Sequence, residues 1–99
     1  MRWSDKDPAE IVPVGFELAD ALASGEAPIA VSAAVTLIAG TDPAPSDLLL
    51  GSAAIVATSV QQWLTGGVDG CDYRVTFTTD TDGGKRLVEA GVVRCRAKS

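Results

Sequence analysis

Histidine is absent from this sequence of 99 residues, and its absence excludes several kinds of chemistry. No catalytic triad with a histidine base, no imidazole metal site and no histidine pH switch can form. The two cysteines, Cys71 and Cys95, are too few for a zinc site made of thiolates alone. Aromatic residues make up only 5% of the chain, which disfavours a carbohydrate site built from a row of exposed rings. We therefore expect no catalytic residues, no cofactor and no metal.

Long apolar runs and targeting segments are also missing. The N-terminus lacks the apolar core behind basic residues that marks a signal peptide. The apolar stretches 27–40 and 48–56 are interrupted or shorter than the roughly 20 residues of a membrane helix. We expect synthesis in the cytosol, reduced thiols and no membrane partner.

The charge is acidic overall and unevenly placed. Eight basic residues face thirteen acidic ones, giving −5, which argues against nucleic-acid binding. Residues 1–70 hold two basic and nine acidic residues (net −7), whereas residues 71–99 hold six and four (net +2). This polarity could join copies head to tail. We favour the simpler explanation, which is solvated faces balanced within one small domain.

Length and composition fit one small domain. A chain of 10.1 kDa should expose roughly 5,300 Å² when folded and roughly 14,600 Å² when extended. Apolar residues make up 46% and charged residues 21%, which is unlike a disordered chain. Pro8 favours extended backbone before it. We therefore expect an extended segment over residues 1–10 and a single domain over residues 11–99.

The first two-thirds of the chain predict short strands separated by turns. Residues 11–16 contain Pro13, which confines them to an edge strand at best. Residues 16–23 predict a short helical turn that stops at Gly25. Alternation over residues 29–38 predicts a strand that ends at Gly40. A loop is expected over 40–47, followed by short strands at 48–50, 53–57 and 59–65.

The last third predicts a β-hairpin. Alternating residues 71–78 and a return strand over 87–97 flank the Asp- and Gly-rich turn 80–84. A hairpin centred on Gly83 places the following residues opposite each other: Tyr73 and Val93, Val75 and Gly91, Cys71 and Cys95, Phe77 and Glu89. The last pair is unfavourable, and a bulge would shift this register. Many short strands and no long helix predict an all-β sandwich.

Three features invite functional interpretation, but each has a structural explanation. Trp63 is expected in the core of so small a sandwich. Cys71 and Cys95 could oxidise or bind a soft metal weakly, but small core-facing hydrophobes are the expected role. Residues 80–83 resemble the start of a calcium loop, yet the twelfth position is Gly91 instead of Glu. We interpret residues 80–83 as a hairpin turn.

Four residues are candidates for a partner interface. Trp3 is an aromatic in what the sequence predicts to be a mobile tail, where it could contact a partner. Arg86, Arg94 and Arg96 make the last strand basic, which suits an acidic partner surface. Charge also protects an exposed edge strand from unwanted pairing, and we favour that explanation.

Several segments, taken in order, resemble a family of small tailed-bacteriophage proteins described as fiber-tail adaptors or tail-associated proteins. The order and spacing of the segments carry the resemblance, since each one alone is turn chemistry or sandwich patterning. The matching segments are 6–10, 25–26, 40–45, 63–70 leading into Tyr73, 78–87, and the basic strand 92–96.

The resemblance implies an immunoglobulin-like β-sandwich of about seven short strands. It also implies a non-enzymatic phage or prophage structural protein, an adaptor that joins tail or head-tail components. Such a protein is made in the host bacterial cytoplasm, resides in the virion, binds other phage structural proteins and can oligomerise on assembly. The alternatives are a small binding module or a virion assembly factor. A hydrolase using Asp or Glu pairs is disfavoured, because no carboxylate lies in a clearly apolar context.

Overall fold

Six strands and two short 3₁₀ turns build the chain in the computed structural model, which describes residues 1–98. The all-β prediction is confirmed, with six strands where about seven were expected. Most of the stretches 48–50 and 53–57 merges into one strand, Leu49–Val56, whose pairing is irregular between Leu50 and Ala54. The elements are β1 (Val12–Glu17), η1 (Ala19–Ala21), β2 (Pro28–Ala39), η2 (Pro45–Leu48), β3 (Leu49–Val56), β4 (Ser59–Leu64), β5 (Asp72–Thr81) and β6 (Arg86–Arg94).

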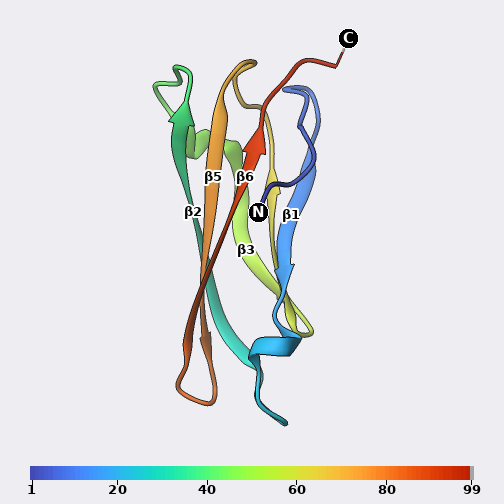
Figure 1. Cartoon of the computed structure of the whole chain (residues 1–99), viewed down its shortest axis with the longest axis vertical. Helices are drawn as coiled ribbons and strands as arrows, with labels where there is room; N and C mark the ends of the chain where they lie inside the picture. Colours follow the sequence, from blue (N-terminus) through green and yellow to red (C-terminus); the bar gives the residue numbers. More distant parts are fainter. Residues whose placement is uncertain (99) are drawn as a thin grey trace.

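The strands form two antiparallel three-stranded sheets with the orders β1-β4-β3 and β2-β5-β6 (Figure 1). The sheets extend along a molecule of 45 × 23 × 22 Å. Alternate residues of the two central strands point into the space between the sheets, where Val60, Leu64, Tyr73, Val75 and Phe77 are at most 1% exposed. The exposed area of 5,333 Å² agrees with the roughly 5,300 Å² expected from the mass.

The hairpin register predicted from the sequence is confirmed. Tyr73 pairs with Val93, Val75 with Gly91, and even the unfavourable pair of Phe77 and Glu89 is present. The turn at the lower end of Figure 1 contains Gly84 with φ +86°, a conformation that glycine adopts without strain. No bulge interrupts this ladder between the pairs Asp72–Arg94 and Asp80–Arg86.

The helical turn expected over residues 16–23 is shorter than predicted. Phe16 and Glu17 continue β1, and only Ala19–Ala21 are helical. The strand continues because Phe16 faces the core and pairs with Val60 of β4.

The sandwich has two sides where edge strands meet. β1 and β6 flank one side, and the N-terminal segment lies between them. β2 packs against β3 on the other side, without backbone pairing between the two strands. The N-terminal segment thus closes the β1–β6 side, whereas no further segment among residues 1–98 lies between β2 and β3.

Candidate interaction surface

The first six residues lie along β6 and pair with it in parallel orientation (Figure 1). The amide of Trp3 donates to the carbonyl of Val92 at 2.9 Å, and the amide of Val92 donates to Met1 at 3.0 Å. Further along the same pairing, the amide of Lys6 donates to the carbonyl of Arg94 at 2.9 Å. These bonds satisfy backbone groups of β6 that would otherwise form an open edge.

Trp3 fastens this segment across the gap between the sheets. Its ring centroid lies 5.3 Å from that of Phe16 in β1, and its Nε1 donates to the carbonyl of Gly15 at 3.4 Å. The edge of the ring covers Gly91 of β6, where no side chain stands in the way. The prediction that Trp3 lies in a mobile tail is therefore wrong. The ring is half-buried, and its other part faces solvent.

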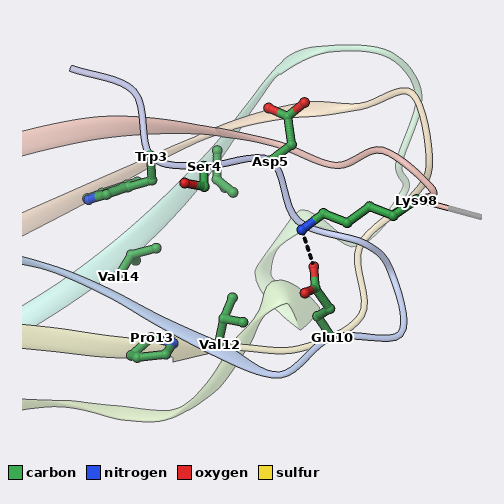
Figure 2. A pocket seen from close by; sticks show the side chains of 9 residues that line it. Trp3, Ser4, Asp5, Glu10, Val12, Pro13, Val14 and Lys98 are labelled. Carbon is green, nitrogen blue, oxygen red and sulfur yellow. Dashed lines mark ion pairs between the residues drawn. The ribbon is translucent and has the colours of Figure 1, made fainter.

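A cavity of about 310 Å³ lies between the N-terminal segment and β1 (Figure 2). Val12 and Val14 give it an apolar wall, and Trp3 stands at one end. Lys98 and Glu10 form an ion pair of 3.0 Å at the other end. The cavity thus combines an apolar wall with a charged rim.

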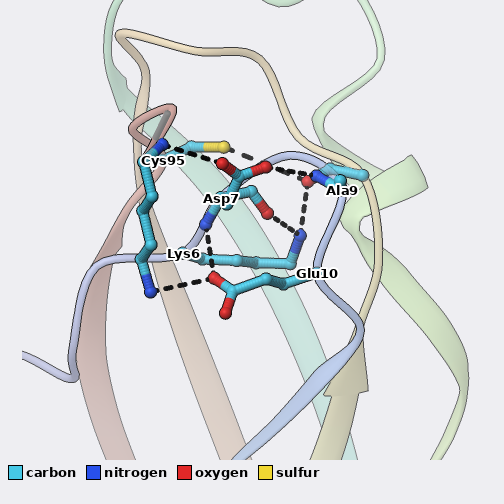
Figure 3. Close-up of polar contacts among 7 residues, drawn as sticks. Lys6, Asp7, Ala9, Glu10 and Cys95 are labelled. Carbon is cyan, nitrogen blue, oxygen red and sulfur yellow. Dashed lines mark hydrogen bonds and ion pairs between the residues drawn. The ribbon is translucent and has the colours of Figure 1, made fainter.

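Lys6 is the buried anchor of the segment (Figure 3). The residue is 1% exposed, and its Nζ donates to the carbonyls of Gly66 at 2.6 Å and Asp7 at 3.0 Å. Loss of hydration on burial lowers the pKa of Lys6. Glu10 accepts a 2.7 Å bond from the Asp7 amide, and this bond together with Lys98 lowers the pKa of Glu10. The segment is therefore tied to the loop after β4.

The three arginines predicted as interface residues each have an acidic neighbour in the chain. Arg86 Nε lies 2.8 Å from Asp80, and Arg96 Nη2 lies 2.8 Å from Asp72. Arg94 Nε lies 4.0 Å from Asp5. Arg86 stands beside the β5–β6 turn, at the opposite end of β6 from the other two. The structure therefore does not bring the arginines and Trp3 into one patch.

The prediction that Trp63 belongs to the core is wrong. Val60, Gln62 and Leu64 of β4 point inward, so Trp63 points outward and is 43% exposed. The inward position is filled by Gln62, which is 1% exposed. Its amide is accommodated because Nε2 donates to the carbonyls of Leu50, Gly51 and Trp63 at 2.9–3.2 Å.

Trp63 lies at the centre of an apolar patch three strands wide. Its cross-strand partners are Pro13 of β1 and Leu50 of β3. Residues directly opposite in antiparallel strands share a face, so the three side chains lie side by side on the outer face of the sheet. Leu50 is 45% exposed and Pro13 is exposed as well. We call Pro13, Leu50 and Trp63 the Trp63 patch.

The cysteines face the core, as predicted. Cys71 and Cys95 are both buried and free, and the amide of Cys95 donates to Cys71 at 2.8 Å. Within residues 1–98, no three acidic or cysteine side chains gather as metal ligands would. None of the helical turns in this part of the chain has the length or apolar character needed to cross a bilayer.

The chain was compared with models of known protein families. Residues 6–94 match the model of a family described as podophage GP4 fiber-tail adaptor protein gp77. The matched range contains all six strands and begins at the buried anchor Lys6. No curated protein matches the chain.

Proposed function

Because the chain belongs to the podophage GP4 fiber-tail adaptor protein gp77 family, we propose that it joins a fiber to the phage tail without catalysing a reaction. It is made in the host cytoplasm and becomes part of the virion on assembly. Its partners are other structural proteins of the tail, and no nucleic acid or membrane takes part.

The observation that supports this proposal is the Trp63 patch. An adaptor acts through its surface, and tryptophan is among the residues that contribute most to protein interfaces. Trp63 is central in its sheet and is flanked on both sides by exposed apolar residues. The backbone of Trp63 is held by the regular β1–β4 ladder, so little backbone entropy is lost on binding. We infer that the patch packs against an apolar surface of a neighbouring tail protein.

The Trp63→Ser variant tests this proposal. Because the ring lies outside the core, the variant should keep the free energy of unfolding within about 1 kcal/mol of the unmodified chain. The binding assay adds purified protein to particles of a podophage that encodes this chain but carries a nonsense mutation in its gene. The unmodified chain should bind these particles, and Trp63→Ser should bind at least tenfold more weakly, as for a residue worth about 2 kcal/mol.

Val56→Ser is the matched control. Val56 is 52% exposed on β3 but lies at the far end of the sheet from the Trp63 patch. It should bind the particles as the unmodified chain does. Equal binding by Trp63→Ser and Val56→Ser would remove the patch from the interface. Failure of the unmodified chain to bind would contradict the adaptor role itself.

A further inference from the structure

The side of the sandwich formed by β2 and β3 has no charged residue along either edge. No Lys, Arg, Asp or Glu occurs in residues 27–41 or in residues 48–68. Charges are a common protection of edge strands against added strands. β3 is broken by the irregularity between Leu50 and Ala54, but the pairing of β2 with β5 is regular from Ala30 to Leu37. β2 is therefore the long, uncharged edge of the molecule.

β2 pairs with β5 on one side only. Within residues 1–98 no strand pairs with its other edge, so alternate N–H and C=O groups of β2 point away from the sheet. These groups are the ones that bind an extended peptide in β-strand addition.

A groove of about 270 Å³ runs between β2 and β3. Val31 and Ala33 line it from one sheet, and Leu49 and Ala53 line it from the other. All four side chains pack against the core yet are only half-buried. The corresponding inward residues of β5 are fully buried. The core is therefore incomplete on this side, and apolar surface remains exposed to water.

The opposite side of the molecule shows how this fold is closed by a strand. There the first six residues pair with β6, and Trp3 bridges the gap to Phe16 and Gly15 of β1. The β2–β3 side has the same components, an edge strand and a gap whose lining is partly apolar, with Ser32, Ser52 and Gln62 beside the apolar residues. It has no equivalent segment among residues 1–98.

We propose that β2 accepts a strand from another tail protein, an inference that rests on the adaptor role proposed above. The donated segment is extended and carries small apolar side chains at alternate positions, which enter the groove. A charged side chain at those positions would be buried without a partner. A second copy of the chain is the poorer occupant, because each copy carries a net charge of −5 and two copies repel each other.

Two neighbouring alanines of β2 provide a matched pair of variants. Ala33 faces the groove, whereas Ala34 lies on the outer face of the same sheet. Ala33→Lys places an ammonium group in the groove, where it reaches solvent while the groove is empty and blocks a donated strand. Ala34→Lys adds the same charge to the same strand without obstructing the groove. Thermal unfolding of both free variants checks that they fold.

Binding to the adaptor-deficient particles is the readout. Ala34→Lys should bind within twofold of the unmodified chain, and Ala33→Lys should bind at least tenfold more weakly. Equal binding by both variants, or equal loss in both, would overturn the proposal while leaving the adaptor role in place. Failure of the unmodified chain to bind would overturn the adaptor role and the proposal with it.

Hydrogen exchange of the unmodified chain gives a second test that does not depend on any variant. Amides of residues 30–37 that exchange rapidly in the free chain should become protected on particles, since a donated strand pairs with them. Unchanged exchange there would overturn the proposal. Sedimentation of the free chain identifies the competing occupant: a dimer that Ala33→Lys dissociates would assign the edge to a second copy.

Discussion

Replacing Gly91 with alanine should loosen the N-terminal segment, because the Trp3 ring occupies the space that a side chain would need. A Cβ at position 91 would lie 2.6 Å from Trp3 Cη2 and 2.8 Å from Cζ3. Carbon atoms make favourable contacts at about 3.5–4.0 Å, so the ring has to move. It is carried by the N-terminal segment, which shifts more easily than the central strand β5.

The cost of Gly91→Ala is limited by what the Trp3 ring contributes. Truncating a fully buried tryptophan costs about 3–5 kcal/mol, so Trp3→Ala, at a half-buried site, should cost about 2 kcal/mol. Gly91→Ala should cost about 1–2 kcal/mol, since alanine recovers part of the roughly 0.5–1 kcal/mol that glycine costs in a strand. For a domain of this size, each 1 kcal/mol lowers Tm by about 4–8 °C.

The assay is urea unfolding of the two single variants and the double variant. In the Trp3→Ala background the clash is gone, so adding Gly91→Ala should cost nothing or stabilise by up to about 1 kcal/mol. Hydrogen exchange at the amides of Val92 and Lys6 should quicken in either single variant. An equal cost of Gly91→Ala in both backgrounds would refute the contact between Trp3 and Gly91.

Two further predictions concern pH. Hydrogen bonds from Thr81 Oγ1 and the Ala23 amide, with the ammonium of Lys85, lower the pKa of Glu26 from 4.5 to about 2. The unfolded chain therefore binds more protons than the folded chain between pH 4.5 and 2. The free energy of unfolding should decrease as the pH is lowered through that range. Urea unfolding of Glu26→Gln should show a smaller fall, and an unchanged one would contradict this assignment. Burial raises the pKa of Tyr73 far above 10.0, so stability should fall as pH rises above 10 and tyrosine ionises only in the unfolded chain. Tyr73→Phe should remove that alkaline loss and cost about 1 kcal/mol at neutral pH; a persisting loss would point to other groups.

The strands and the β5–β6 register could be predicted because they depend on nearby residues. Alternation fixes which side chains of a strand share a face, and a turn of defined composition fixes the pairing that follows it. The core-facing positions of Cys71 and Cys95 follow from that register. The edge position of β1 could be inferred from Pro13, whose nitrogen cannot donate to a second neighbour.

The core position predicted for Trp63 rests on residue type, whereas alternation along β4 places Trp63 on the outer face. Val60 and Leu64 have the same parity, and both point inward in β4. That parity alone places Trp63 on the outer face and assigns the intervening core position to Gln62. The pattern predicts the Trp63 patch, but the buried Gln62 amide also needs the carbonyls of Leu50 and Gly51 in β3, which local sequence does not reveal.

The docking of the N-terminal segment could not be read from local patterns. Its partners lie some 90 positions away in the chain, and its parallel pairing has no connecting turn to mark it. One signal was present: Gly91, in a strand of otherwise larger residues, marks a place where another group approaches closely. The gap between β2 and β3 likewise depends on how the two sheets pack, which alternation along one strand does not determine.

Quantitative mass spectrometry of intact particles tests the adaptor role most directly. The particles are those of a podophage that encodes this chain, purified away from lysate proteins. The adaptor role predicts this chain in the particles, in several copies and at a fixed ratio to the tail proteins. Absence from intact particles, with the chain present in the lysate, would contradict that role and favour an assembly factor.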